Sequence, residues 1–141
     1  MSKSFLKTPD NLEGKLSKTP VFLVGSERSG TTMLRLMLND HPDVCFFHEF
    51  EYVVEQILDN GDFPDLEDYR EWLSCHRIFL DSGFKIDKEL TYTRLVNSFL
   101  EQWQKQEGKP FVGATVHYSF DKLLRIWPDA KFIHIVRDPR D

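Results

Sequence analysis

The chain has 141 residues, about the length of one domain, and its 40% hydrophobic and 29% charged residues are typical of a globular protein with a buried core. A net charge of −5 excludes a general basic surface for nucleic acid or anionic membranes, so an anionic ligand would need local cationic groups. No apolar run is long enough for a signal peptide or a membrane span, and Cys45 and Cys75 form no close pair. We therefore expect a cytoplasmic protein with no membrane span and no nucleic-acid partner.

The first part of the chain predicts a strand, a loop and a helix in immediate succession. Residues 1–19 are rich in Lys, Ser and Thr, and we expect them to be a flexible lead-in. Val21 to Val24 form a continuous apolar run, typical of a strand buried on both faces. A helix is expected over 30–39, because Pro42 disfavours helix in the residue before it.

The rest of the chain alternates between expected strands and helices. The clearest amphipathic helix begins at Tyr92 and continues to Trp103, with apolar residues at i, i+3, i+4 and i+7 spacing. The other expected elements are a strand at 44–47, helices at 51–58 and from 64 onwards, a strand at 111–116, a helix around 120–127 and a strand at 131–136. This alternation predicts an α/β fold with a mostly parallel sheet. Because the chain stops at a polar turn after the last strand, we expect 20–141 to be the N-terminal part of a domain truncated at its C-terminus.

The loop after the first strand has the spacing of a phosphate-binding loop. Gly25 and Gly30 are followed by Thr31 and Thr32, but Thr31 stands where such loops usually have Lys. A strand, a tight loop and a helix in this order direct backbone N–H groups and a helix N-terminus at an anion. Arg28 supplies a cation inside the loop instead. The loop therefore predicts a phosphate site that needs no metal.

Two motifs give the chain a resemblance to a known family. The segment Gly25-Ser-Glu-Arg-Ser-Gly-Thr-Thr32 resembles the 5′-phosphosulfate loop of sulfotransferases that use 3′-phosphoadenylyl sulfate (PAPS). The segment Arg137-Asp-Pro-Arg-Asp141 is similar to the 3′-phosphate motif of that family. Each motif follows a strand, which places both at the carboxyl ends of a parallel sheet, where open α/β folds bind ligands. The resemblance implies a three-layer P-loop-type fold and transfer of a sulfuryl group from the co-substrate PAPS to a hydroxyl or amine of a small-molecule or peptide acceptor.

The resemblance also implies roles for individual residues. The PAPS-binding residues would be Ser26, Glu27, Arg28, Ser29, Gly30, Thr31, Thr32 and Arg137. Arg28 would in addition be catalytic, by stabilising charge on the transferring group. The segment from His41 to Phe50 aligns without a gap to the part of tyrosylprotein sulfotransferases that carries a catalytic glutamate, and the match falls on Glu49.

Glu49 is the expected general base for the acceptor. Three phenylalanines flank it, and burial among them would raise the pKa of a carboxylate, which suits a base near neutrality. His48 is the alternative base, because the ordinary pKa of histidine lies near neutrality. Glu49 could instead be an acid at the start of the next helix.

The segment Gly113–Tyr118 departs from the family pattern. It lacks the Lys and the Pro of the Gly-x-Lys-x-Pro sequence that the family often carries. Lys122 and Arg125 could supply the missing cation if their helix pointed inward, although charges on a solvated helix face are the simpler interpretation. His117 could bind substrate or be structural.

Three further interpretations stay open. A kinase-like P-loop nucleotide-binding protein could use Asp138, but it would need the loop Lys. His41, Cys45 and His48, with Glu49 nearby, have the ligand types of a zinc site but lack a second close pair. The chain could also be a catalytically incompetent fragment that acts as a binding module. The sequence indicates neither one acceptor nor an oligomeric state.

Overall fold

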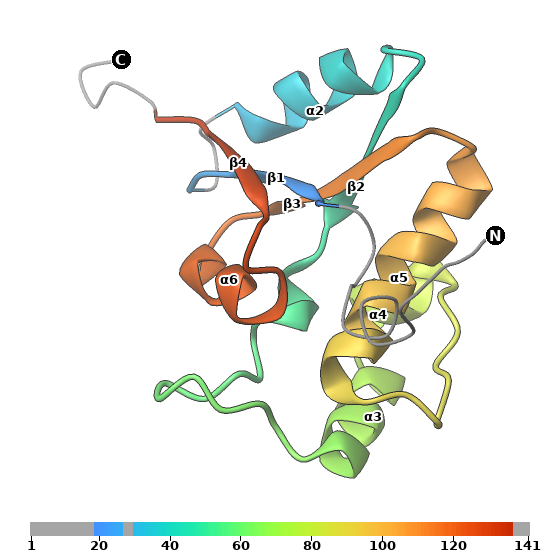
Figure 1. Ribbon diagram of the computed structural model, residues 1–141, viewed down its shortest axis with the longest axis vertical. Helices are drawn as coiled ribbons and strands as arrows, with labels where there is room; N and C mark the ends of the chain where they lie inside the picture. The colour runs from blue at the N-terminus through green and yellow to red at the C-terminus, as the bar shows by residue number, and fades with distance from the viewer. Residues whose placement is uncertain (1–18, 27–29, 137–141) are drawn as a thin grey trace, which may run out of the picture.

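The protein folds around a parallel sheet, which confirms the predicted α/β architecture. The computed structural model describes residues 19–26 and 30–136. In this part of the chain the strands are β1 (Val21–Val24), β2 (Val44–Glu49), β3 (Phe111–Val116) and β4 (Lys131–His134). Their pairings are parallel and the sheet order is β2-β3-β1-β4 (Figure 1). The lead-in predicted over 1–19 lies outside the described residues except for Thr19.

Helices cover both faces of the sheet. Among the described elements, α2 (Thr31–Asn39) lies on one face, and α5 (Tyr92–Glu107) and α6 (Leu123–Ile126) lie on the other, with α3 (Leu66–Ser74) and α4 (Arg77–Ser82) beyond α5 (Figure 1). Connections between parallel strands are right-handed, and the chain moves in one direction from β1 to β2 but in the reverse direction from β2 to β3 and from β3 to β4. Opposite directions place the helices on opposite faces, which gives the three layers.

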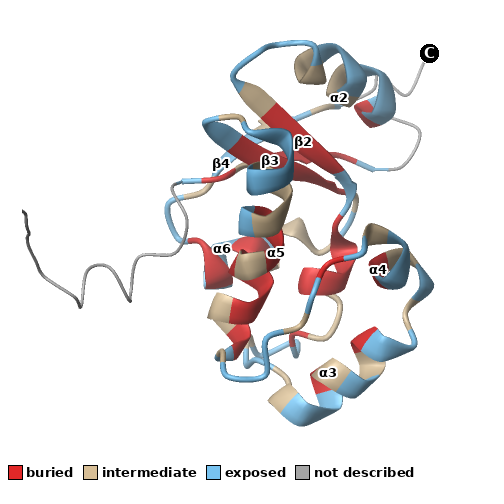
Figure 2. Cartoon of the chain, turned by 90° about the vertical axis from the view of Figure 1, so that its right-hand side faces the viewer, coloured by how far each residue is buried: buried red, intermediate tan, exposed pale blue. Residues whose placement is uncertain are grey.

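The main core lies between the sheet and α5. Leu95, Phe99 and Leu100 are fully buried on the face of α5 that the spacing predicted. Phe47 of β2 packs edge-on against the Trp103 ring, with the ring centres 5.1 Å apart. Each large apolar side chain that is removed from water in this way contributes about 2 kcal/mol. Figure 2 shows this concentration of buried residues between the layers and the exposed outer side of α2. The core therefore fixes the strand ends that carry the site.

A side-chain clamp joins the end of α2 to the middle of β2. The Asn39 amide donates to the Phe46 carbonyl at 3.2 Å, and its side-chain oxygen accepts from the Phe46 backbone N–H at 2.6 Å. Lys109 Nζ in turn donates to the Asn39 carbonyl at 2.8 Å. These bonds satisfy backbone groups at the helix end and fix β2 relative to α2.

The structure differs from the predicted elements mainly between residues 44 and 90. β2 continues to Glu49, and the helix predicted over 51–58 is wrong, because this segment forms the 3₁₀ turn η1 (Glu51–Val53) and further turns. The four consecutive residues from Glu51 to Val54 are all buried, whereas a surface helix buries only one stripe. The short helix α4 was not predicted. The predicted helix around 120–127 consists of η2 (Phe120–Lys122) followed by α6.

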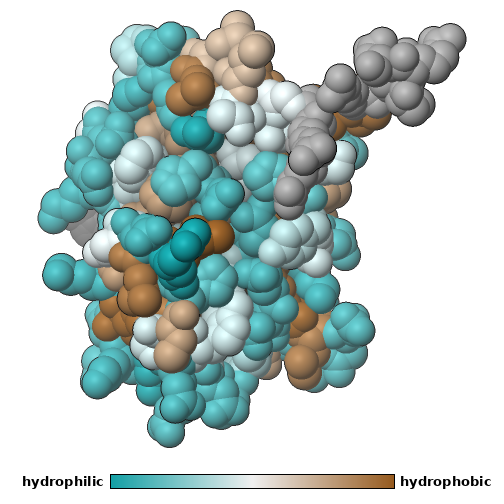
Figure 3. Space-filling view, turned by 180° about the vertical axis from the view of Figure 1, so that it is seen from behind, coloured by the Kyte–Doolittle hydropathy of each residue, from teal (hydrophilic) through white to brown (hydrophobic). Residues whose placement is uncertain are grey.

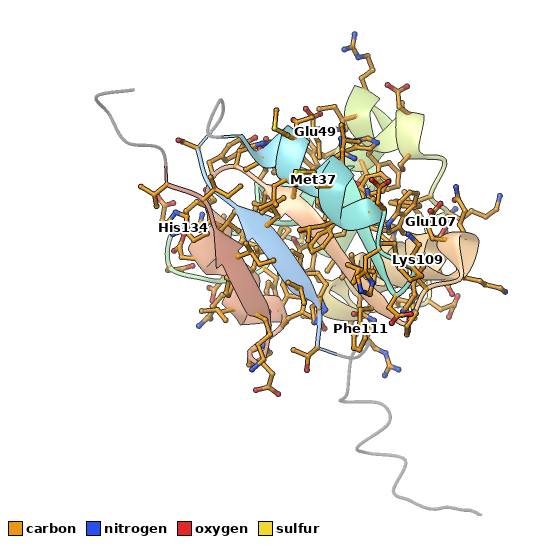
Figure 4. All side chains as sticks on the ribbon, turned by 90° about the horizontal axis from the view of Figure 1, so that it is seen from above. Met37, Glu49, Glu107, Lys109, Phe111 and His134 are labelled. Atoms are coloured by element: carbon orange, nitrogen blue, oxygen red, sulfur yellow. The ribbon has the colours of Figure 1, made fainter. Side chains whose placement is uncertain are left out.

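The surface of the described part is mainly polar, with separate apolar patches, as Figure 3 shows for one face. Met33 and Met37 on α2 are 70% and 63% exposed, and Figure 4 shows Met37 on the outer side of this helix. None of the helices in the described ranges is both long and apolar enough to cross a lipid bilayer.

Candidate functional site at the carboxyl edge of the sheet

The carboxyl ends of the strands meet at one edge of the sheet, next to the start of α2. Figure 4 shows Glu49, the last residue of β2, at this edge and Phe111, the first residue of β3, at the opposite edge. β1 leads through α2 to β2, whereas β3 leads to β4 on the other side of β1. The chain thus diverges at the carboxyl ends of β1 and β3, and open α/β sheets bind ligands in the crevice at such a point.

Two cavities open at this edge and share part of their lining. The larger has a volume of about 470 Å³ and is lined by Gly30, Thr31, Thr32, Glu49, Glu51, His117 and Tyr118, together with Ile78 of α4. The smaller has a volume of about 320 Å³ and is lined by Thr32, Arg35, His48, Glu49, Thr115 and His117. The structure therefore brings together the start of α2, the end of β2 and the segment that follows β3.

Two kinds of polar group that have no partner among the described residues face these cavities. Gly30 precedes α2 with a φ of 99°, and neither a side-chain cap nor an acidic residue in the first turn satisfies the N–H groups at the start of this helix. The Thr115 hydroxyl is buried, with 3% of the residue exposed, and makes no hydrogen bond within the described part of the chain. Buried hydroxyls and helix N-termini without partners both favour an oxygen-rich, anionic ligand.

A hydrogen-bonded chain of three side chains joins α2, the end of β3 and η1. The Thr31 hydroxyl lies 3.0 Å from Nε2 of His117, and Nδ1 of His117 lies 2.8 Å from Oε2 of Glu51. The backbone N–H of His117 donates to the same Glu51 oxygen at 2.6 Å. The side chains are only 15% and 10% exposed for His117 and Glu51, so this network is largely shielded from water.

Burial determines the protonation behaviour of Glu51. Removal from water raises the pKa of this carboxyl, and the hydrogen bonds from His117 oppose the rise without cancelling it. The folded protein therefore binds a proton on Glu51 more tightly than the unfolded chain does.

This shift predicts a pH-dependent stability difference for Glu51→Gln. Because the folded-state pKa is the higher one, the free energy of unfolding of the wild type falls as the pH rises from about 4, the ordinary glutamate range, through the folded-state pKa of Glu51. The neutral variant lacks this loss, so its stability relative to wild type should rise over the same range. Urea unfolding at a series of pH values measures the difference. Glu101→Gln removes an exposed carboxylate on α5 and is the matched control. The same dependence of stability on pH in both variants would contradict a raised pKa for Glu51.

Several predicted PAPS-binding residues fall within the described part. Gly30, Thr31 and Thr32 line the larger cavity. Gly30 and Thr32 are exposed, whereas Thr31 is buried and its hydroxyl lies against His117. Ser26 is exposed two residues after the end of β1. The predicted residues Glu27, Arg28, Ser29 and Arg137 lie outside the described residues.

The two candidate bases lie at the end of β2. Glu49 is exposed and lines both cavities, so the burial among phenylalanines that we expected is absent, and Glu49 ends a strand rather than starting a helix. His48 lines the smaller cavity, and burial, followed by the nearby Arg35 charge, lowers its pKa. Both residues can reach a ligand from the sheet edge.

Two sequence-based alternatives, an inward-pointing cation and a zinc site, are not supported by the described residues. Lys122 and Arg125 do not reach the cavities, because Lys122 Nζ donates to the Ile57 carbonyl and Arg125 Nε donates to the Gly61 carbonyl, which anchors the intervening loop. The described residues contain no group of three or more His, Cys, Asp or Glu side chains that could hold a metal, so the proposed zinc ligands do not converge. Cys45 is buried, whereas His48 is exposed near the carboxyl end of the same strand.

Sequence reasoning assigned no role to five cavity residues, which are Arg35, Glu51, Ile78, Thr115 and Tyr118. Glu51 was expected to begin a helix, and its position two residues after Glu49 gave no sign of its contact with His117. Arg35 follows Thr31 by one helical turn, a spacing that places both on one face of α2 and could have identified it. Ile78 comes from α4, which was not predicted.

Comparisons with known proteins agree with this geometry. The model of a family described as the sulfotransferase family matches residues 20–141. Protein-tyrosine sulfotransferase 1 of Mus musculus and that of Homo sapiens are each 31% identical to the chain over 129 residues, which cover 85% of this chain but 31% of those proteins. A solved structure, the sulfotransferase domain from the Synechococcus PCC 7002 olefin synthase, has a similar fold with a TM-score of 0.50 and 21% identity, over 96% of this chain and 53% of that one. The chain thus spans about a third of the curated relatives that it matches.

Proposed function

Because the chain belongs to the sulfotransferase family, we propose that it carries the PAPS-binding loop and the general base of an enzyme that moves a sulfuryl group from PAPS to a hydroxyl or amine acceptor. The acceptor would be a small molecule or a peptide. The observation that supports this most directly is the larger cavity, which is lined both by Thr31 and Thr32 at the start of α2 and by Glu49 at the end of β2.

Each group has a defined task in the proposed reaction. Glu49 takes the proton of the acceptor while the acceptor oxygen or nitrogen attacks sulfur in line with the leaving group. The bond between sulfur and the bridging phosphate oxygen breaks, and adenosine 3′,5′-bisphosphate leaves. The N–H groups at the start of α2 and the loop residues from Ser26 to Thr32 hold the 5′-phosphosulfate.

Charge balance makes Arg28 and Arg137 necessary to this proposal. The described cavity lining carries the carboxylates Glu49 and Glu51, and Arg35 is the only lysine or arginine that it contains. PAPS is strongly anionic, so further cations are needed beside its phosphates. In this proposal Arg28 stabilises the transferring group and Arg137 binds the 3′-phosphate.

Ligand-induced stabilisation tests the proposal. Adenosine 3′,5′-bisphosphate at 100 times its Kd should stabilise the protein by about 2.7 kcal/mol and raise the Tm by several degrees, whereas ATP with Mg²⁺ should not. Differential scanning fluorimetry measures both. Arg28→Ala should remove most of the shift, and Arg70→Ala on α3 is the control.

The same measurement separates the alternatives. A larger Tm shift with ATP and Mg²⁺ would favour the kinase-like interpretation. Binding of adenosine 3′,5′-bisphosphate without transfer to any acceptor would identify a binding module. An unchanged shift in Arg28→Ala would show that the loop is not the binding site.

A further inference from the structure

We propose that His117, held by Glu51, is a positioning residue that orients the Thr31 hydroxyl, so that binding of a phosphate-bearing ligand at the start of α2 is accompanied by uptake of one proton on His117. This inference rests on the proposed function and deepens it. It concerns the three side chains of the shielded network, which lie on elements separated by up to 86 residues of sequence.

The hydrogen bonds define the direction of the network in the free protein. The backbone N–H of His117 donates to Oε2 of Glu51 at 2.6 Å, and Nδ1 of the His117 ring lies 2.8 Å from the same oxygen. An ionised carboxylate oxygen can only accept a hydrogen bond. Nδ1 of His117 therefore carries a hydrogen. In the neutral ring Nε2 is then an acceptor, and the Thr31 hydroxyl must donate to it across 3.0 Å.

This direction is unsuitable for an anionic ligand. The Thr31 hydroxyl has one hydrogen, and His117 uses it, so the side chain presents only lone pairs to the cavity. A phosphate oxygen beside these lone pairs would be repelled. If Nε2 gains a proton from solvent, it donates to the Thr31 oxygen instead, and the hydroxyl hydrogen is released to the ligand.

Protonation also adds a positive charge where the ligand needs one. Glu51 compensates this charge on the protein side, and the anion compensates it on the cavity side. Other charged or titratable groups of the described residues that lie near His117 are Glu49 and His48 on β2, Arg35 on α2, and Glu55, whose carboxylate accepts from the adjacent Tyr118. Of these, His48 is the other group that could take up a proton near neutrality.

Calorimetric titration with adenosine 3′,5′-bisphosphate counts the protons. Between pH 7.5 and 9 the phosphates of the ligand are fully ionised, because their second pKa is about 6, so they take up no proton themselves. Titrations in buffers of different ionisation enthalpy should show uptake approaching one proton for each ligand bound. The affinity should fall by up to about tenfold for each pH unit in this range.

Two substitutions of His117 separate orientation from simple packing. His117→Gln places an amide N–H near the position of Nε2, so it should bind the ligand with little pH dependence and without proton uptake. His117→Asn is too short to reach Thr31, so its affinity should be lower at all pH values. His41→Gln, on an exposed loop, is the control that should behave as wild type.

Nitrogen chemical shifts of the His117 ring report the protonation directly in the wild type. The free protein at pH 8 should show a hydrogen on Nδ1 alone, and the complex should show hydrogens on both nitrogens. Ligand binding without a change in these shifts, or loss of the pH dependence in His48→Gln rather than in His117→Gln, would overturn the inference and leave the proposed function intact. Failure of the wild type to bind the ligand at all would overturn both.

Discussion

Replacing Glu49 by Gln should lower the rate of sulfuryl transfer about 10²- to 10⁴-fold, the usual contribution of a general base, and leave the affinity for adenosine 3′,5′-bisphosphate almost unchanged. Glutamine has the same shape as glutamate but cannot take the acceptor proton in the proposed reaction. Glu49 lies at the carboxyl end of β2 and faces both cavities, so it is accessible to an acceptor bound beside the loop. Release of adenosine 3′,5′-bisphosphate from PAPS, measured with saturating acceptor, gives the rate.

Two matched variants make this result specific. Glu107→Gln removes a carboxylate at the end of α5, away from the cavities, and should leave the rate unchanged (Figure 4). His48→Gln removes the alternative base, and its effect should be much smaller than that of Glu49→Gln. A larger loss of rate in His48→Gln would assign the base to His48.

Gly113→Ala should destabilise the protein by at least about 3 kcal/mol, the upper end of what overpacking usually costs. Gly113 lies in β3 between β1 and β2, in register with Val21 and Phe46. A Cβ atom there would lie 1.7 Å from the Val21 carbonyl oxygen and 2.9 Å from the Phe46 ring. The first of these atoms belongs to the backbone of a central strand and cannot move without breaking sheet hydrogen bonds. Urea unfolding measures the loss.

Gly108→Ala is the matched control for this substitution. Gly108 caps α5 with a φ of 68°, and a Cβ atom there would meet nothing within 4 Å. Its cost should be about 1–2 kcal/mol, from the left-handed backbone alone. Equal destabilisation by the two variants would show that β1 and β3 do not approach each other as closely as described.

The elements that build the site edge were predictable because each has a strong local pattern. The apolar runs predicted β1 and β3 with the bounds that the structure shows, and the glycine spacing predicted the start of α2. The position of Glu49 in the cavity followed from a gapless alignment. Local patterns of this kind need no knowledge of what packs against the segment.

The environment of the carboxylates was not predictable in the same way. Cys45 and Phe47 are buried on one side of β2, and plain alternation would bury Glu49 on that side too. The register between β2 and β3 shifts between Phe47 and Glu49, which re-aims the strand end and exposes Glu49. Such an irregularity depends on the partner strand. The contact of Glu51 with His117 likewise depends on strand order, which the sequence does not state.

The strand order has a consequence for how the site comes into being. β1 pairs with β3 and β4, and β2 pairs with β3, but β1 and β2 do not pair with each other. Within the described chain, neither β1 nor β2 therefore has a partner strand until residues 111–116 of β3 are available. Non-local pairings of this kind pay their loop-closure entropy before they gain stability and therefore form slowly. During synthesis, the apolar segments of β1 and β2 therefore stay unpaired until the ribosome has released the residues of β3. We expect the Thr31–His117 contact to be among the last to form, so that the first half of the chain alone would have no anion affinity and would need protection from aggregation.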